Sequence, residues 1–232
     1  RSKLKLFMNI SNMPVIAIDG PSASGKGTVA QLVSENLGFQ YLDSGSLYRL
    51  VALKAIRIGA DLNDEKALEN IAQILDVTFT GRKIQLGGEE VADLIRQEVY
   101  GNGASKVAAH PGLREALLDR QRAFRKDPGL VADGRDMCSV VFPDATLKIF
   151  LTAAPEVRAE RRYKQLMEKG EGVNINKILK DIEARDKRDS IRIVAPLKQS
   201  KDSNLVDTTL LNITEVVNKI LKQYSEISIK SI

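Results

Sequence analysis

Residues 20–28 have the residue types and the spacing that bind a chain of phosphates. They follow the apolar run 15–18 and precede a helical pattern that begins at Thr28. Backbone N–H groups of a glycine-rich turn and of a helix N-terminus point at a bound anion, and a lysine adds a mobile positive charge. The spacing G-x-x-x-x-G-K predicts a loop that binds the phosphates of a nucleoside triphosphate. Its residues are Gly20, Pro21, Ser22, Ala23, Ser24, Gly25, Lys26, Gly27 and Thr28.

A candidate metal ligand ends the apolar run 130–132, where Asp133 precedes a Gly-Arg-Asp sequence. A carboxylate at the end of a strand beside a phosphate loop is a usual ligand of Mg²⁺, directly or through water. We expect the hydroxyl of Thr28 to face the same ion. The alternative for both residues is structural: Asp133 would cap the next helix, and Thr28 would be a hydroxyl at a helix start.

Arginines recur around the edge where these groups are expected to meet. They are Arg49, Arg114, Arg135, Arg158, Arg161, Arg162, Arg185, Arg188 and Arg192. A planar guanidinium binds phosphate oxygens in pairs and stacks on bases. Phosphoryl transfer between two nucleotides depends on such positioning and charge stabilisation rather than on a covalent intermediate. Each arginine alone is more often a solvated surface residue, so the group as a whole favours this chemistry.

Short apolar runs that end in polar residues alternate with helical patterns and predict the elements that position these side chains. The runs 15–19, 39–43, 130–133, 147–152 and 204–207 are typical of strands. The alternation implies right-handed crossovers and a five-stranded parallel sheet flanked by helices on both faces. Ligands of such folds bind at the carboxyl ends of the strands. We therefore expect an α/β protein with the P-loop NTPase fold.

Two segments interrupt this alternation within the expected domain, residues 14–232. Residues 61–103 combine a helical pattern at 64–75 with two alternating runs that predict a β-hairpin, and this suits a small α+β insert. Residues 156–192 are charged and helical with a glycine-containing break at 170–172. Few of them could belong to a core, so we interpret this segment as a mobile helical lid. After it, apolar residues at helical spacing predict a terminal amphipathic helix.

Composition limits the class of protein. The chain has 232 residues, of which 43% are hydrophobic and 28% charged, as in ordinary globular proteins. No apolar run approaches the roughly 20 residues that cross a bilayer, so we expect no membrane partner. The single cysteine, Cys138, excludes an internal disulfide and suits the reducing cytoplasm, and with one histidine it leaves too few ligands for a Cys/His zinc site. That histidine, His110, precedes a proline at a helix start, where a solvated capping position is expected.

The net charge of +5 does not by itself indicate a nucleic-acid partner. The compact basic cluster at Arg158, Arg161 and Arg162 is interleaved with glutamates, and the chain has no tryptophan to stack on bases. An anionic small molecule accounts for the charge equally well, so we expect no nucleic acid and a monomer. Residues 1–13 are interpreted as an N-terminal remnant, with Met8 or Met13 as candidate starts.

Several phrases together resemble the bacterial cytidylate kinases, a family of nucleoside monophosphate kinases. The phosphate loop ends in Gly-Lys-Gly-Thr rather than Gly-Lys-Thr, and similar phrases occupy residues 42–49, 132–137, 141–145 and 185–189. The resemblance covers the chain from about Met13 to its end. It implies that the γ-phosphoryl group of ATP is transferred to CMP or dCMP with Mg²⁺, in pyrimidine nucleotide supply. Residues 61–103 would then bind the nucleoside monophosphate, and 156–192 would be the lid.

The resemblance also implies roles for individual residues. Ser44, Arg49 and Arg135 look like contacts to the CMP phosphate, and Arg185 and Asp189 look like contacts to the sugar. Ser105, Arg114 and Asp136 resemble the cytosine readers. Lys26, Arg135, Arg158, Arg162 and Arg188 resemble the residues that act on the transferring phosphate, and Arg192 resembles a lid or phosphate arginine. A carboxylate that accepts from the exocyclic amine of cytosine would be mismatched to uracil.

Two positions depart from the family pattern. Ala23 stands where a second loop glycine is common, and alanine is tolerated there only if its φ angle is negative. Cys138 replaces a glycine that often follows Asp-Met. We expect its thiol, near the cytosine pocket, to be an inert apolar filler.

Two other functions are consistent with parts of this pattern. A kinase for UMP and CMP, or for another small metabolite, would share the phosphate loop and the arginines. A phosphate-loop switch or nucleic-acid-dependent ATPase would share the loop alone. The grouping of Ser44, Arg114 and Asp136 favours an enzyme that recognises a nucleotide acceptor.

Overall fold

The computed structural model describes residues 13–81, 83–168, 170 and 172–230. The expected N-terminal remnant therefore lies outside the described residues except for Met13, as do Arg82 in the expected hairpin turn and Glu171 in the expected lid break. Among the described residues no helix is both long enough and apolar enough to cross a membrane.

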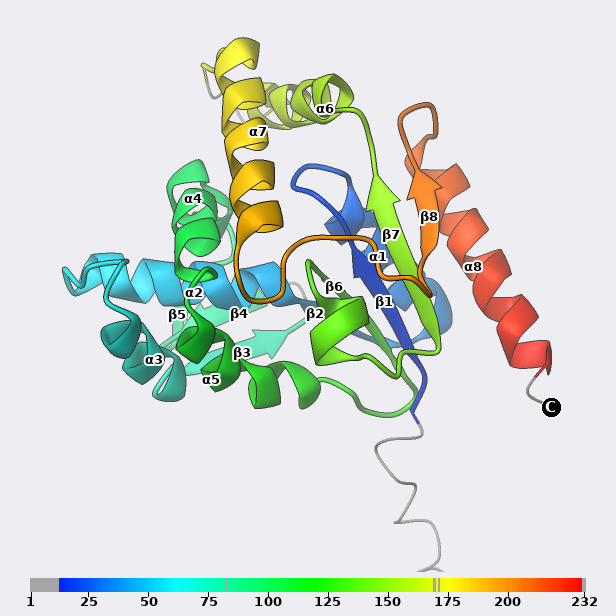
Figure 1. Ribbon diagram of the computed structural model, residues 1–232, viewed down its shortest axis with the longest axis horizontal. Coiled ribbons are helices and arrows are strands. Elements are labelled where there is room, and N and C mark those ends of the chain that lie inside the picture. Colours follow the sequence, from blue (N-terminus) through cyan, green and yellow to red (C-terminus); the bar gives the residue numbers. More distant parts are fainter. Residues whose placement is uncertain (1–12, 82, 169, 171, 231–232) are drawn as a thin grey trace, which may run out of the picture.

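A five-stranded parallel sheet forms the centre of the molecule, in the order β2-β6-β1-β7-β8 (Figure 1). Its strands are β1 (Val15–Asp19), β2 (Gln40–Asp43), β6 (Leu130–Gly134), β7 (Leu147–Thr152) and β8 (Asn204–Asp207). The expected sheet is confirmed, and three strands have the predicted bounds. β2 begins one residue late and β6 continues to Gly134.

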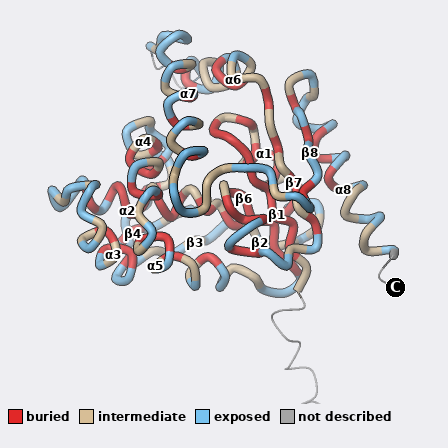
Figure 2. Tube along the Cα trace, in the orientation of Figure 1, coloured by how far each residue is buried: buried red, intermediate tan, exposed pale blue. Residues whose placement is uncertain are grey.

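Helices cover both faces of the sheet because alternate strand residues point to opposite sides. Ile16 and Ile18 of β1 pack with α1 (Lys26–Leu37) and α8 (Ile213–Lys230), and α8 is the expected terminal helix. Val15 and Ala17 face the larger core, which the helices α2 (Ser44–Arg57), α3 (Glu65–Gln73), α4 (Glu98–Val107) and α5 (Pro111–Arg122) share. Figure 2 shows the buried residues gathered in the central sheet and on the helix sides that face it.

The segment between α2 and β6 carries the small antiparallel sheet β3-β4-β5. β3 (Val77–Thr80) and β4 (Lys83–Leu86) form the expected hairpin, and β5 (Glu89–Glu90) adds a third short strand. The one-turn helix η2 (Leu94–Arg96) then leads into α4. His110 stands at the start of α5 as expected, but its role differs. Its Nε2 lies 3.0 Å from the Leu62 carbonyl oxygen, so the ring is a tertiary contact rather than a solvated cap.

The helices α6 (Pro155–Glu168) and α7 (Ile175–Ile191) stand together above the carboxyl ends of the strands (Figure 1). Few residues of this segment are buried and apolar, as expected, but those few form a core of their own. Leu166 of α6 packs against Ile178 and Ile182 of α7, and this small cluster also contacts Ala23 of the phosphate loop. The pair is thus a unit with its own apolar contacts, placed directly over the loop.

Candidate active site

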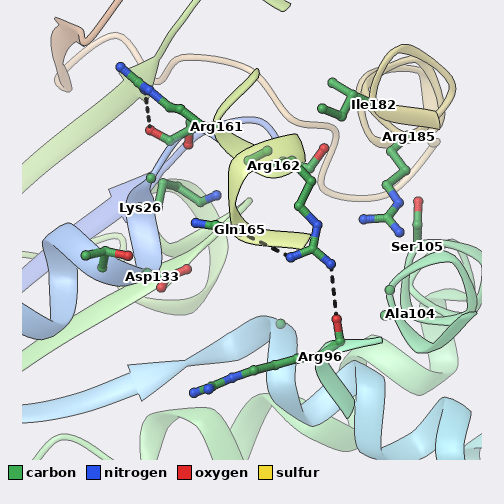
Figure 3. A pocket seen from close by; sticks show the side chains of 18 of the residues that line it. Lys26, Arg96, Ala104, Ser105, Asp133, Arg161, Arg162, Gln165, Ile182 and Arg185 are labelled. Atoms are coloured by element: carbon green, nitrogen blue, oxygen red, sulfur yellow. Dashed lines mark hydrogen bonds between the residues drawn. The ribbon is translucent and has the colours of Figure 1, made fainter. Parts of the chain in front are cut away.

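A cavity of about 1390 Å³ opens between the carboxyl ends of the strands, the helix α4 and the pair α6–α7. Typical pockets for one drug-sized ligand span about 300–1000 Å³, so this cavity is large enough for more than one such molecule. Figure 3 shows Lys26 and Asp133 on one side, Ser105 and Arg185 on the other, and Arg162 between them.

The phosphate loop forms one end of the cavity. Gly20 follows the last residue of β1 and has φ +156°. A Cβ there would lie 1.9 Å from the Leu151 carbonyl oxygen of β7, so the close approach of the chain to β7 at this point requires glycine. Gly25 has φ +90° and begins α1. The buried hydroxyls of Ser22 and Ser24 have no hydrogen-bond partner among the described residues, which is the state expected of groups that a ligand would satisfy.

Lys26 and Ala23 complete the loop. The Lys26 ammonium is buried and donates to the Pro21 carbonyl oxygen at 3.0 Å. Burial and then the neighbouring Arg135 lower the pKa of Lys26 to about 8, so an incoming phosphate would favour its charged form. The condition that we set for Ala23 is not met, because its φ angle is +56°, in the left-handed region that favours glycine.

Asp133 lies beneath the first turn of α1, with one carboxylate oxygen accepting from the Tyr41 hydroxyl at 2.9 Å. Burial and then Asp43 raise the pKa of Asp133 to about 6. The capping alternative is not what the structure shows, since it is Asp43 that caps the next helix, α2, through the Ser46 N–H. Thr28 is exposed and lines the same cavity.

The opposite end of the cavity holds a buried ion pair between Arg114 of α5 and Asp136. Arg114 also donates to the Ala108 carbonyl oxygen at 3.1 Å, and its guanidinium carbon lies 5.5 Å from the centre of the Tyr48 ring. Asp136 is 3% exposed and precedes the π-helical turn η3 (Met137–Val141). The pair is a fixed combination of donor and acceptor at the cavity wall.

Buried groups beneath Asp136 hold this turn in place. Asp19, at the end of β1, accepts from the N–H groups of Met137 at 2.8 Å and Cys138 at 2.9 Å. The Cys138 thiol is buried, burial raises its pKa above the usual value, and it lies 3.4 Å from the Ala17 carbonyl oxygen. Cys138 is buried, as a filler would be, but it faces the sheet and is not among the residues that line the cavity, and the inertness of its thiol stays a prediction.

The residues expected to bind the acceptor phosphate and sugar also line the cavity. Ser44 donates to the buried Gln121 side chain at 2.7 Å, and Arg49 donates to the Ile95 carbonyl oxygen at 2.6 Å. Asp189 of α7 accepts from Arg135 at 2.9 Å and from Ser105 at 3.2 Å. Burial opposes the ionisation of Asp189, but Arg135 outweighs it and the pKa lies below its usual value.

Four arginines of the lid line the cavity, namely Arg161, Arg162, Arg185 and Arg192. Arg162 and Arg185 both pair with Glu98, at 2.6 Å and 2.5 Å. Arg192 donates to the Ala195 carbonyl oxygen at 2.5 Å, and its Nη2 is buried without a hydrogen-bond partner among the described residues. That unsatisfied nitrogen is available to an acceptor atom of a ligand.

Two expected catalytic arginines are not among the lining residues of the cavity as the structure describes it. Arg158 is 3% exposed and donates to the carbonyl oxygens of Ser22 and Ala153, both at 3.0 Å, and pairs with Asp186 at 2.7 Å. It therefore ties the lid to the phosphate loop from behind. Arg188 donates to the Ser105 hydroxyl at 3.3 Å, outside the lining.

Sequence reasoning missed several residues of the site. Glu98 belongs to no motif, and the sequence patterns predict no helix that begins there. Arg161 is named among the arginines of the ligand edge but is given no role of its own, yet it donates to the Thr208 carbonyl oxygen at 2.6 Å and joins the lid to the loop before α8. Tyr41 and Gln121 act through Asp133 and Ser44, and such pairings between distant segments leave no local signal.

The sequence is similar to a known protein family and to curated bacterial proteins. A family model described as cytidylate kinase matches residues 16–226. The chain is 58% identical over 214 residues to the cytidylate kinase of Nitrosomonas eutropha, covering 92% of this chain and 96% of that protein. It is 53% identical over 218 residues to the cytidylate kinase of Bordetella pertussis, covering 94% and 98%. A solved gluconokinase structure from Sinorhizobium meliloti aligns with a TM-score of 0.47 at 15% identity, covering 92% and 93%.

Proposed function

The chain belongs to the cytidylate kinase family and phosphorylates CMP with ATP, and from that premise we propose how its cavity divides between the two nucleotides. ATP binds at the end formed by residues 20–28, and CMP binds between Ser44, the Arg114–Asp136 pair and Arg192. The observation that carries this division is that one continuous cavity is lined by the phosphate loop at one end and by a fixed donor–acceptor pair at the other.

For the donor, the loop N–H groups and Lys26 bind the ATP phosphates. The unpaired hydroxyls of Ser22 and Ser24 support a ligand at this place. Beyond Thr28 the lining continues with Leu211, Ile213 and Arg161. Apolar side chains and a guanidinium plane suit a purine base, so we place adenine here.

For the acceptor, Asp136 accepts from the exocyclic amine of cytosine, while Arg114 and Ser105 donate to its N3 and O2 atoms. Ser44, Arg49 and Arg135 bind the phosphate, and Arg185 and Asp189 bind the sugar. The mutual pairing of Arg114 with Asp136 and of Arg135 with Asp189 supports this arrangement, because it holds each group in one orientation before the ligand arrives. The same contacts can serve dCMP, and we propose it as a second acceptor.

Mg²⁺ fits the donor end. Asp133 and Thr28 present hard oxygen ligands to the cavity, and the raised pKa of Asp133 shows a buried carboxylate that a cation would stabilise. When bound, the ion neutralises charge on the β- and γ-phosphates. Tyr41 holds Asp133 in place for that contact.

The chain itself acts by positioning and charge. Lys26, Arg135 and Arg162 surround the place where the γ-phosphoryl group passes in line from ATP to the CMP phosphate, and they stabilise the charge of its oxygens. Arg158 fixes the position of the lid relative to the phosphate loop by donating to the Ser22 carbonyl oxygen. Arg188 donates to the Ser105 hydroxyl and so orients it. The lid excludes water, which would otherwise compete with CMP for the phosphoryl group.

We assign residues 14–232 to one kinase domain, in which 61–103 is the acceptor-binding insert and 156–192 the lid. We further propose that the protein is a monomer and acts in the cytoplasm, where a single free thiol stays reduced.

The assay that tests this function measures ADP and the phosphorylated acceptor together, with CMP, dCMP, UMP, AMP and GMP in parallel. The expected result is equal amounts of ADP and CDP with CMP, turnover of dCMP, and far lower kcat/KM with UMP. ADP formation without a phosphorylated acceptor would instead indicate a switch ATPase. Equal kcat/KM with UMP and CMP would contradict the role given to Asp136.

A further inference from the structure

Glu98 joins the three parts of the cavity that must come together around the nucleotides. It lies in the first turn of α4. Arg162 of α6 donates to its Oε1 from Nε at 2.8 Å and pairs with the same oxygen through Nη2 at 2.6 Å. Arg185 of α7 pairs with Oε2 at 2.5 Å. One carboxylate thus uses each of its oxygens for a different helix of the lid.

The charges around Glu98 explain why a carboxylate is needed there. Partial burial opposes its ionisation, but Arg185 and Arg162 outweigh that effect, and the pKa of Glu98 lies below its usual value. Arg49 of α2 adds a third positive charge nearby. Without a bound phosphate, these arginines would repel one another across the cavity. Glu98 supplies the negative charge that keeps them together.

Further contacts show that the carboxylate fixes geometry as well as charge. Arg185 also donates to the Asn102 side chain at 2.8 Å and lies against Gly101, where a Cβ would be 2.7 Å from its Nη2. Arg162 reaches toward the Arg96 carbonyl oxygen at 3.4 Å (Figure 3). Both guanidinium groups are therefore held on the α4 side of the cavity, facing the space between Lys26 and Ser105.

We propose that Glu98 is a positioning residue that holds Arg162 and Arg185 in their working places and so latches the lid onto α4. The inference rests on the proposed function of those two arginines, as contacts to the transferring phosphate and to the acceptor sugar. Glu98 makes no contact with a reacting atom in this account. Glu98 preorganises the site, because the two arginines and the lid already have their closed arrangement before the nucleotides bind.

The salt bridge between Glu89 and Arg57 provides a matched control. It is also a two-oxygen pair, with distances of 2.7 Å and 2.8 Å, and it joins Glu89 of the same insert to Arg57 of α2. Neither Glu89 nor Arg57 lines the cavity, and the Glu89 side chain is 56% exposed. Exposed pairs of this kind contribute little to stability. Glu89→Gln therefore makes the same chemical change without touching the lid.

The experiment compares Glu98→Gln, Glu89→Gln and the unaltered protein. For Glu98→Gln we expect kcat to fall about 10- to 100-fold, the usual scale for a misplaced catalytic arrangement. The KM for CMP should rise, because Arg185 loses its support, while the KM for ATP stays within about twofold, since the phosphate loop is untouched. Glu89→Gln should match the unaltered protein in all three.

A second measurement does not depend on catalysis. Hydrogen exchange of the backbone amides of α6 and α7, without nucleotide, should be about tenfold faster in Glu98→Gln than in the unaltered protein. Unchanged exchange would overturn the latch even if CMP proved not to be the acceptor. A fall of kcat with both KM values unchanged would also overturn it, because a smaller folded fraction gives that pattern. Failure of the unaltered protein to phosphorylate CMP would instead contradict the proposed function.

Discussion

Replacing Asp136 with asparagine should remove the preference for CMP over UMP while leaving ATP binding intact. The change keeps the size of the side chain and one acceptor oxygen, but removes the charge that pairs with Arg114. The amide can also turn its NH₂ group outward, and this group can donate to the O4 atom of uracil, which a carboxylate opposes. The variant therefore loses a contact to cytosine and gains one to uracil.

The size of the effect follows from the burial of the pair. With side chains 7% and 5% exposed, Arg114 and Asp136 read the base in a site that excludes water. A well-placed base contact of this kind discriminates by about 1–3 kcal/mol, so the ratio of kcat/KM for CMP over UMP should fall roughly 5- to 150-fold. The Arg114 charge loses its buried counter-ion but keeps its bond to the Ala108 carbonyl oxygen, so we expect a stability loss of about 3–5 kcal/mol.

The assay is ADP release with CMP and with UMP, together with the Kd for ATP from a binding titration. Asp144→Asn is the control, because Asp144 forms a comparable 2.6 Å pair with Arg125 but is 56% exposed and lies outside the cavity lining. The reasoning is refuted if Asp136→Asn lowers the kcat/KM for CMP and UMP equally. A matching loss of ATP affinity would assign Asp136 to the donor site instead.

Two substitutions and one chemical modification experiment test separate parts of the structure. Ala23→Gly should stabilise the protein by about 1 kcal/mol, raising Tm by about 2–4 °C in thermal unfolding, because Ala23 has φ +56°. Tyr41→Phe removes a hydrogen bond that lowers the pKa of Asp133, so the pKa of this carboxylate should rise above about 6. In a pH–rate profile, the fall of kcat on acidification should therefore begin at a higher pH than in the unaltered protein. The Cys138 thiol should not react with a thiol reagent until the protein is unfolded, since it is buried with a raised pKa; rapid reaction in the native state would contradict its position.

The sheet could be predicted closely from the sequence because its strands are short apolar runs with polar residues at their ends. β1, β7 and β8 have the predicted bounds, and the phosphate loop follows β1 as its spacing indicates. The core of the lid could not be predicted in this way. Its apolar residues, such as Leu166 and Ile182, are few and separated by charges, and they form a cluster only because α6 and α7 pack together.

The site was only partly predictable, since residue type does not say which way a side chain points. Arg158 and Arg162 are four residues apart and share one face of α6, yet Arg158 is buried behind the phosphate loop and Arg162 faces the cavity. The φ angle of Ala23 depends on the whole loop rather than on its own identity. Glu98 is recognisable only once α4, α6 and α7 are placed in space, because its partners lie 64 and 87 residues away.

The most direct test of the account is a crystal structure of the protein with CMP and a non-hydrolysable ATP analogue bound together. The account predicts the analogue phosphates within the loop of residues 20–28 and the exocyclic amine of cytosine within hydrogen-bond distance of Asp136, with Arg162 between the two nucleotides. It is contradicted if cytosine lies away from Arg114 and Asp136, or if the two nucleotides occupy separate cavities.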